Sequence, residues 1–93
     1  MEIKTEINAK GGRFYIEKQG NEVAKMTFQQ ETDAKMNIDH TEVDESLQGQ
    51  GVAHKLLDAA VAYAREHNLK VRATCSYAKS ALKKNTDYND VLI

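Results

Sequence analysis

One stretch decides how the chain folds: Glu42-Val43-Asp44-Glu45-Ser46-Leu47-Gln48-Gly49-Gln50-Gly51-Val52-Ala53-His54-Lys55-Leu56-Leu57. It predicts the end of a strand, a tight turn and the start of a helix. Gly49 and Gly51 allow backbone angles that other residues resist, and they let a ligand come close to the backbone. The first N–H groups of a helix lack internal partners, and the helix dipole adds positive charge there. The sequence therefore predicts an anion seat at this turn, suited to a diphosphate.

Two other glycine-rich phosphate patterns do not fit this turn. A dinucleotide-binding G-x-G-x-x-G motif starting at Gly49 would need a third glycine where His54 stands. A P-loop is excluded because the chain contains no G-x-x-x-x-G-K-(S/T). An ordinary strand–helix turn, in which the glycines serve only the geometry, remains as an alternative.

The spacing within the turn resembles the acetyl-CoA signature of the GNAT superfamily of acyl-CoA N-acyltransferases, (Gln/Arg)-x-x-Gly-x-(Gly/Ala). Gln48, Gly51 and Ala53 occupy its three defined positions. Val43 stands where the family has the last hydrophobic residue of the preceding strand. The resemblance implies an N-acetyltransferase that moves an acetyl group from acetyl-CoA to an amine. A non-catalytic acyl-CoA-binding or regulatory module is the alternative, and a scaffold that binds protein through a sheet edge is a third hypothesis.

Size and composition limit the other possibilities. A chain of 93 residues predicts one small domain over residues 1–93. A formal charge of −1 and a pI near 6.3 provide no basic surface for nucleic acid. No apolar run approaches the roughly 18 residues of a membrane span, and we expect no signal peptide. The single cysteine excludes an internal disulfide and favours a reducing, cytoplasmic location. We expect a monomer or a weak dimer.

The pattern around the turn predicts an α+β fold with a mixed sheet. Short glycine turns between alternating segments indicate antiparallel hairpins in the first half. The strand, helix and strand centred on the turn form a β-α-β unit, whose two strands should be parallel. This order is that of a minimal GNAT-like fold ending in a short C-terminal helix. The expected strands are 3–8, 13–18, 22–30, 34–43 and 70–75, and the expected helices are 49–67 and 77–85.

Two finer expectations concern the edges of these elements. Ser46 could cap the N-terminal region of the main helix. Strict alternation along the fourth strand would place one set of side chains on a single face. That set is Ala34, Met36, Ile38, His40 and Glu42.

The resemblance also implies which residues meet the cofactor. Backbone groups around Thr41 to Val43 would pair with the pantetheine arm, and amides of the turn would hold the diphosphate. The expected cofactor-binding residues are Thr41, Val43, Gln48, Gly49, Gln50, Gly51, Val52, Ala53 and His54.

Candidate catalytic groups flank the expected thioester. His40 and Glu42 are two residues apart on one strand, so they share a face and could act as a base or water-relay pair. A solvated pair at a strand end is the alternative. Cys75 ends the fifth strand, where it could accept the acetyl group or contact the thiolate. It could equally be a small buried apolar residue.

The usual catalytic acid of the family is missing from its expected place. GNAT enzymes often carry a tyrosine in a Leu-Tyr-x-x-x-Gly-Phe pattern on the next helix. The comparable run here starts at Leu82, and Lys83 stands in the position of the tyrosine. Tyr77 or Tyr88 could replace it, although packing is an alternative role for each. His54 and His67 have no matched partner in the sequence, so we expect no metal site.

Overall fold

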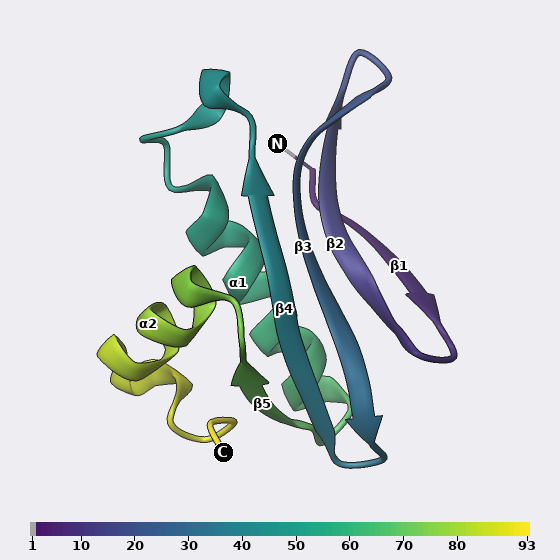
Figure 1. The fold of residues 1–93 in the computed structure, drawn as a ribbon, viewed down its shortest axis with the longest axis vertical. Coiled ribbons are helices and arrows are strands. Elements are labelled where there is room, and N and C mark those ends of the chain that lie inside the picture. Colours follow the sequence, from purple (N-terminus) through teal and green to yellow (C-terminus); the bar gives the residue numbers. More distant parts are fainter. Residues whose placement is uncertain (1) are drawn as a thin grey trace.

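The computed structural model describes residues 2–93, and its five strands lie side by side in chain order. Neighbouring strands from β1 to β4 are antiparallel, whereas β4 and β5 are parallel and α1 connects them (Figure 1). This arrangement confirms the predicted α+β class with its mixed sheet. The elements are β1 (Lys4–Asn8), β2 (Gly11–Lys18), β3 (Asn21–Thr32), β4 (Lys35–Val43), η1 (Glu45–Leu47), α1 (Val52–Glu66), β5 (Lys70–Ala73), α2 (Ser76–Lys84) and η2 (Thr86–Tyr88).

A two-residue turn fixes the hairpin between β2 and β3. Gln19 and Gly20 have φ angles of 53° and 80°, and Lys18 pairs directly with Asn21. Positive φ at both turn residues is the type I′ geometry, whose twist matches that of the flanking strands. The register of this hairpin places the apolar residues of both strands on one face.

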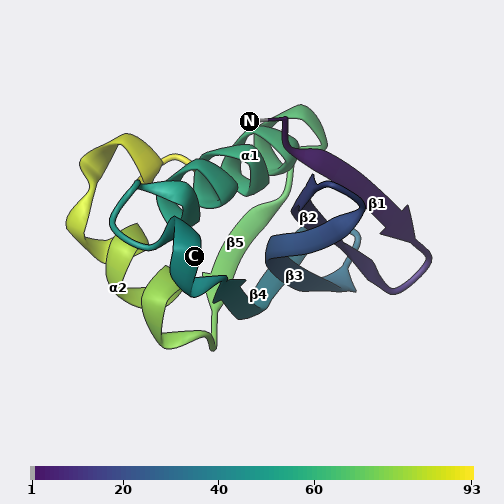
Figure 2. The same cartoon turned by 90° about the horizontal axis from the view of Figure 1, so that it is seen from above.

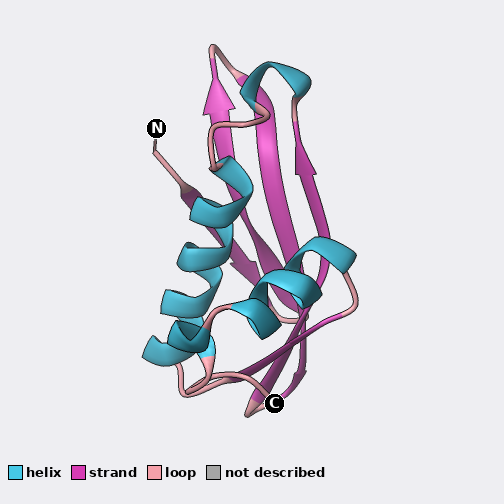
Figure 3. Cartoon of the chain, turned by 90° about the vertical axis from the view of Figure 1, so that its left-hand side faces the viewer, coloured by secondary structure: helices cyan, strands magenta, loops and turns pink. Residues whose placement is uncertain are grey.

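The core lies between that face of the sheet and α1 (Figure 2). Phe14 and Phe28 stack with ring centroids 5.6 Å apart, and the ring of Tyr63 on α1 packs against both. α2 lies beside β5 (Figure 3). Within residues 2–93 no helix covers the opposite face of β2 and β3, where Arg13 stacks on Tyr15 and pairs with Glu22. The sheet therefore has one buried face and one open, polar face.

A β-bulge changes the face that the end of β4 presents. Ile38 pairs with Phe28, but His40 already pairs with Thr27, so Asp39 is an extra residue in β4. An extra residue reverses the alternation beyond it. Met36 and Ile38 are buried in the core, as expected. The prediction was wrong for the other three side chains of this set: Ala34 precedes β4, while His40 and Glu42 point to the open face.

The start of α1 also differs from the prediction. The helix begins at Val52, three residues later than expected, with Gly51 as its N-cap and with no capping side chain among residues 2–93. Ser46 does not cap this helix. It lies in η1, where its backbone N–H donates to the Asp44 carboxylate at 2.9 Å. The turn therefore continues through both glycines before the helix starts.

An exposed ion pair attaches the C-terminal segment to α1. The Arg65 guanidinium donates through two nitrogens to the two carboxylate oxygens of Asp90, each at 2.9 Å. This contact lowers the pKa of Asp90. A carboxyl group with a lowered folded pKa stabilises the fold above its unfolded pKa, and this stabilisation is lost as the pH falls through the folded value.

We therefore expect Asp90→Asn to reduce stability at neutral pH and to flatten the loss of stability below about pH 4. Urea unfolding at a series of pH values measures both effects. Asp33→Asn is the matched control, since Asp33 lies exposed in the β3–β4 turn and makes no ion pair within residues 2–93. If stability falls as steeply with decreasing pH in Asp90→Asn as in the native protein, this prediction is contradicted.

Candidate functional site

An open pocket of about 250 Å³ lies where β4 ends and α1 begins. Its walls come from β4, from η1, from the glycine turn, from the first turn of α1 and from the start of α2. Segments that are distant in sequence therefore meet around the predicted anion seat. The lining residues are Val43, Leu47, Gln48, Gly49, Gly51, Val52, Ala53, His54 and Tyr77.

The glycine turn is unobstructed. Gly49 and Gly51 have φ angles of 81° and 72°, a region that favours glycine. Apart from the glycine and its two chain neighbours, a Cβ atom built on either residue would have no heavy atom of residues 2–93 within 4 Å. Within residues 2–93 no side-chain hydrogen bond caps α1, and the first amides of a helix have no intrahelical acceptor. The turn can therefore present N–H groups to an anion in the pocket.

The two acidic residues before the turn do not line this pocket. Asp44 accepts a hydrogen bond from the backbone N–H of Ser46, and this bond lowers the pKa of Asp44. The Asp44 carboxylate therefore caps η1. Gln50 is also turned away, since its amide nitrogen donates to the Ser46 carbonyl at 3.3 Å. Of the predicted cofactor-binding residues, Gln50 and Thr41 do not line the pocket.

The strands β4 and β5 separate immediately beyond Ile38. Their pairing ends at Ile38 and Ala73, and the backbone N–H groups of Thr74 and Cys75 both donate to the Ile38 carbonyl. Past this point the Cys75 thiol donates to the Thr41 hydroxyl, with Sγ and Oγ1 3.2 Å apart. The fold therefore brings two predicted site residues together across the opening between the parallel strands.

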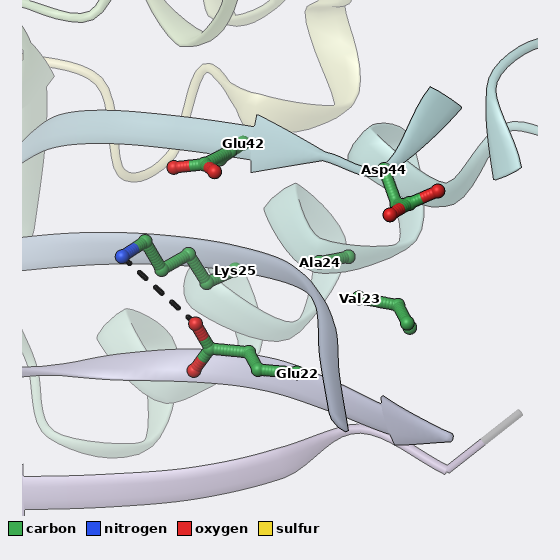
Figure 4. Close-up of a pocket in the computed structure, with 6 residues that line it drawn as sticks. All are labelled: Glu22, Val23, Ala24, Lys25, Glu42 and Asp44. Carbon is green, nitrogen blue, oxygen red and sulfur yellow. Dashed lines mark ion pairs between the residues drawn. The ribbon is translucent and has the colours of Figure 1, made fainter. Parts of the chain in front are cut away.

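His40 and Glu42 are in contact, but not in the pocket. Nε2 of His40 and Oε2 of Glu42 are 3.2 Å apart, and both side chains are more than half exposed. They lie on the open face of the sheet. There Glu42 borders a shallow hollow, in which Lys25 extends between Glu22 and Glu42 and pairs with Glu22 at 3.9 Å (Figure 4). The bulge thus separates this pair from the face that carries the glycine turn.

The structure distinguishes the two tyrosines that the sequence leaves as alternatives. Tyr77, in the first turn of α2, lines the pocket and is 38% exposed. Burial raises the pKa of Tyr77, with smaller contributions from Asp58 and Cys75. Tyr88 is 3% exposed, and its hydroxyl donates to Asp58 at 2.6 Å. Tyr77 is therefore the tyrosine that a ligand in the pocket can reach.

Sequence reasoning missed two residues of this region. Leu47 supplies an apolar wall, and its place as the buried residue of η1 follows only from the turn geometry. Asp58 contacts His54, and the i, i+4 spacing of the two residues on a helix was the available signal. Among residues 2–93, no three His, Cys, Asp or Glu side chains are grouped so as to hold a metal ion.

The fold and the site together define a GNAT-superfamily domain: a mixed sheet with a glycine turn at the head of the helix that links two parallel strands. The chain belongs to the GCN5-related N-acetyl-transferase family, whose profile matches residues 13–91. This family assignment confirms the resemblance noted in residues 43–53. Among residues 2–93, no helix is long and apolar enough to cross a membrane.

Comparison with individual proteins agrees with this assignment. The chain is similar to a GCN5-like protein from Staphylococcus aureus whose solution structure is known, with 45% identity, a TM-score of 0.80, and 99% of this chain and 87% of that chain covered. Protein NATD1 of Xenopus tropicalis is 29% identical over 84 residues, which cover 89% of this chain and 77% of that protein. A GNAT family acetyltransferase from Elizabethkingia anophelis, solved with acetyl-CoA bound, shares the fold at 16% identity, with a TM-score of 0.65 over 81% of this chain and 52% of that chain.

Proposed function

We propose that this protein is an N-acetyltransferase that moves the acetyl group of acetyl-CoA to an amine carried by a small molecule or a protein. The observation that carries the proposal is the unobstructed glycine turn, which opens on a pocket beside the separation of β4 and β5. Family membership supports it, as does the acetyl-CoA bound to the Elizabethkingia relative. The single cysteine is unpaired, which supports a reducing, cytoplasmic location. We also propose that the chain forms one domain.

The cofactor would lie along the end of β4. Amides of residues 48–54 would hold the diphosphate at the helix start, where partial positive charge favours an anion. The backbone of residues 41–43 would pair with the pantetheine arm. The thioester would then reach the opening between β4 and β5, next to the contact between Cys75 and Thr41.

The reaction needs one base and one acid, and each has a candidate on its own side of the sheet. His40, held by Glu42 on the open face, would take a proton from the acceptor ammonium. The free amine would attack the thioester carbonyl, so that a C–N bond forms, the C–S bond breaks and the nitrogen releases its second proton to water. Tyr77 in the pocket would protonate the departing thiolate. The acceptor would approach from the open face.

Cys75 has two possible roles in this scheme. Its thiolate could attack the thioester first and carry the acetyl group as an enzyme thioester before the amine takes it. Otherwise Cys75 only contacts the leaving sulfur. Mass spectrometry after incubation with acetyl-CoA separates the two, because only the first role gives an acetyl adduct on Cys75. Full turnover by Cys75→Ala would remove the thiol from the mechanism.

A non-catalytic acyl-CoA-binding module is the second candidate, and one observation favours it. Lys83 occupies the position at which the family pattern has its tyrosine acid. The two functions differ in thiol release when the protein is incubated with acetyl-CoA and a panel of primary amines. Release that depends on an amine supports the transferase, whereas binding of acetyl-CoA without such release supports the module.

Gly51→Ala tests the anion seat. A side chain at φ 72° strains the backbone by roughly 1–2 kcal/mol and displaces the amides around it. Because a hydrogen bond to a charged group contributes about 1.5–3 kcal/mol, the loss of one should weaken acetyl-CoA binding by about tenfold or more. Isothermal titration calorimetry measures this change.

Gly20→Ala is the matched control for Gly51→Ala. Gly20 also has a positive φ, 80°, and open space around its Cβ position, but it lies in the β2–β3 turn, away from the pocket. Both variants should lose similar stability, and only Gly51→Ala should lose affinity. Equal affinities in the two variants would argue against a diphosphate at this turn.

A further inference from the structure

A chain of polar contacts connects the pocket to the C-terminal segment. Tyr88, in η2, donates its hydroxyl hydrogen to Oδ1 of Asp58 on α1, at 2.6 Å. The other carboxylate oxygen of Asp58 lies 3.4 Å from Nε2 of His54, one helical turn closer to the glycine turn. His54 is itself part of the pocket wall. A buried phenol thus holds a carboxylate, and that carboxylate contacts a cation-forming side chain beside the anion seat.

The contact between Tyr88 and Asp58 is the rigid part of this chain. Tyr88 is 3% exposed, and a buried hydroxyl needs a hydrogen-bond partner. Burial, followed by the hydrogen bond to Asp58, raises the pKa of Tyr88, so the phenol stays protonated and acts as the donor. One oxygen of Asp58 is therefore occupied and its position is fixed, which leaves the second oxygen facing His54.

Histidine gains a defined orientation when one of its ring nitrogens is held by a carboxylate. In the imidazolium form both nitrogens carry hydrogen. With Nε2 facing Asp58 at 3.4 Å, Nδ1 is the ring nitrogen of His54 left for a hydrogen bond to a ligand. Tyr77 on α2 also lines this pocket, and burial raises the pKa of its phenol.

We propose that Asp58 and Tyr88 are positioning residues, which orient the His54 imidazolium so that it donates a hydrogen bond to a diphosphate oxygen of the cofactor. This inference rests on the proposed function, because it needs acetyl-CoA in the pocket. It assigns a role to the segment after α2, which the reaction scheme does not use. It also provides the seat with a side-chain hydrogen-bond donor beside its backbone amides.

The expected effect is a coupling between residues, not a general loss of stability. His54 and Asp58 are both about half exposed, and an isolated i, i+4 pair of this kind contributes little to stability. A merely structural pair would leave ligand affinity unchanged. A positioning pair changes the affinity for a ligand with a diphosphate, and does so only while His54 is present.

The test is a double-mutant cycle measured by isothermal titration calorimetry with two ligands, acetyl-CoA and S-acetylpantetheine, which lacks the diphosphate. His54→Gln and Asp58→Asn should each weaken acetyl-CoA binding by about threefold to tenfold. The double variant should bind no more weakly than His54→Gln alone. Neither variant should change binding of S-acetylpantetheine relative to the native protein.

Two further variants complete the design. Asp33→Asn makes the same change in net charge as Asp58→Asn but lies in the β3–β4 turn, so it should not alter acetyl-CoA affinity. Tyr88→Phe keeps the buried ring and removes the hydroxyl, and it should weaken acetyl-CoA binding only when His54 is present. Tyr88→Phe replaces Asp58→Asn in the cycle if the latter does not fold, as judged by its thermal unfolding.

The possible failures are distinguishable. If the native protein does not bind acetyl-CoA, the proposed function fails. If the native protein binds it and the effects of His54→Gln and Asp58→Asn simply add, the positioning role is overturned and the function stands. The same conclusion follows if Asp58→Asn weakens S-acetylpantetheine as much as acetyl-CoA.

Discussion

Tyr77→Phe is expected to slow amine acetylation by about 100-fold or more, because a positioned general acid contributes typically about 10²–10⁴-fold to a rate. Tyr77 is the pocket tyrosine, and burial raises its pKa, so the phenol is protonated when a thiolate needs a proton. The substitution removes only the hydroxyl and preserves the ring. We therefore expect a fall in kcat with little change in the Kd of acetyl-CoA, measured with an amine that supports thiol release.

Tyr63→Phe provides the control for this prediction. It makes the same chemical change on α1, where the ring packs against Phe14 and Phe28 in the core. Its turnover should match that of the native protein. If Tyr77→Phe also keeps kcat within about twofold of the native value, Tyr77 is not the acid and the leaving thiolate is protonated by another group.

Leu56→Ala is expected to lower the free energy of unfolding by about 2–5 kcal/mol, the usual range for removing a buried leucine side chain. Leu56 is fully buried on α1, against the face of the sheet that carries the core. Small domains have a total stability of only about 5–15 kcal/mol, so this single change should consume a large fraction of it. Urea unfolding followed by circular dichroism measures the difference.

Glu66→Ala is the matched control on the same helix. Glu66 is exposed at the last residue of α1, and substitutions of this kind usually change stability by less than about 0.5 kcal/mol. A loss below about 1 kcal/mol in Leu56→Ala would contradict the packing of α1 described above. Since α1 carries the anion seat at its first turn, that packing is also what holds the seat in place.

The fold was predictable where local signals agree with one another. Alternating apolar residues and the Gln19–Gly20 turn define a hairpin without tertiary information, and the strand–helix–strand order requires a parallel pair. The bulge at Asp39 was not predictable in this way. Residues 39–42 are all polar, so the sequence does not show which face each of them takes, and only pairing with β3 shows that one residue is extra.

The residues of the site were likewise predictable as a group only where they are close together in the sequence. The residues of the glycine turn are contiguous, so one motif was sufficient to propose them together. The contact of Cys75 with Thr41 spans 34 residues, and that of Tyr88 with Asp58 spans 30. Such contacts depend on the parallel pairing of β4 and β5 and on the path of the C-terminal segment. Neither is encoded in a local pattern, so the contact between Tyr88 and Asp58 emerged only from the structure.

The most direct measurement of the central claim is an NMR titration of the labelled protein with acetyl-CoA. If the turn holds the diphosphate, the backbone amide signals of residues 48–54 should show the largest saturable shifts, with smaller shifts at Thr41 and Cys75. Unchanged amide signals at millimolar acetyl-CoA, or shifts confined to the open face of the sheet, would contradict the account.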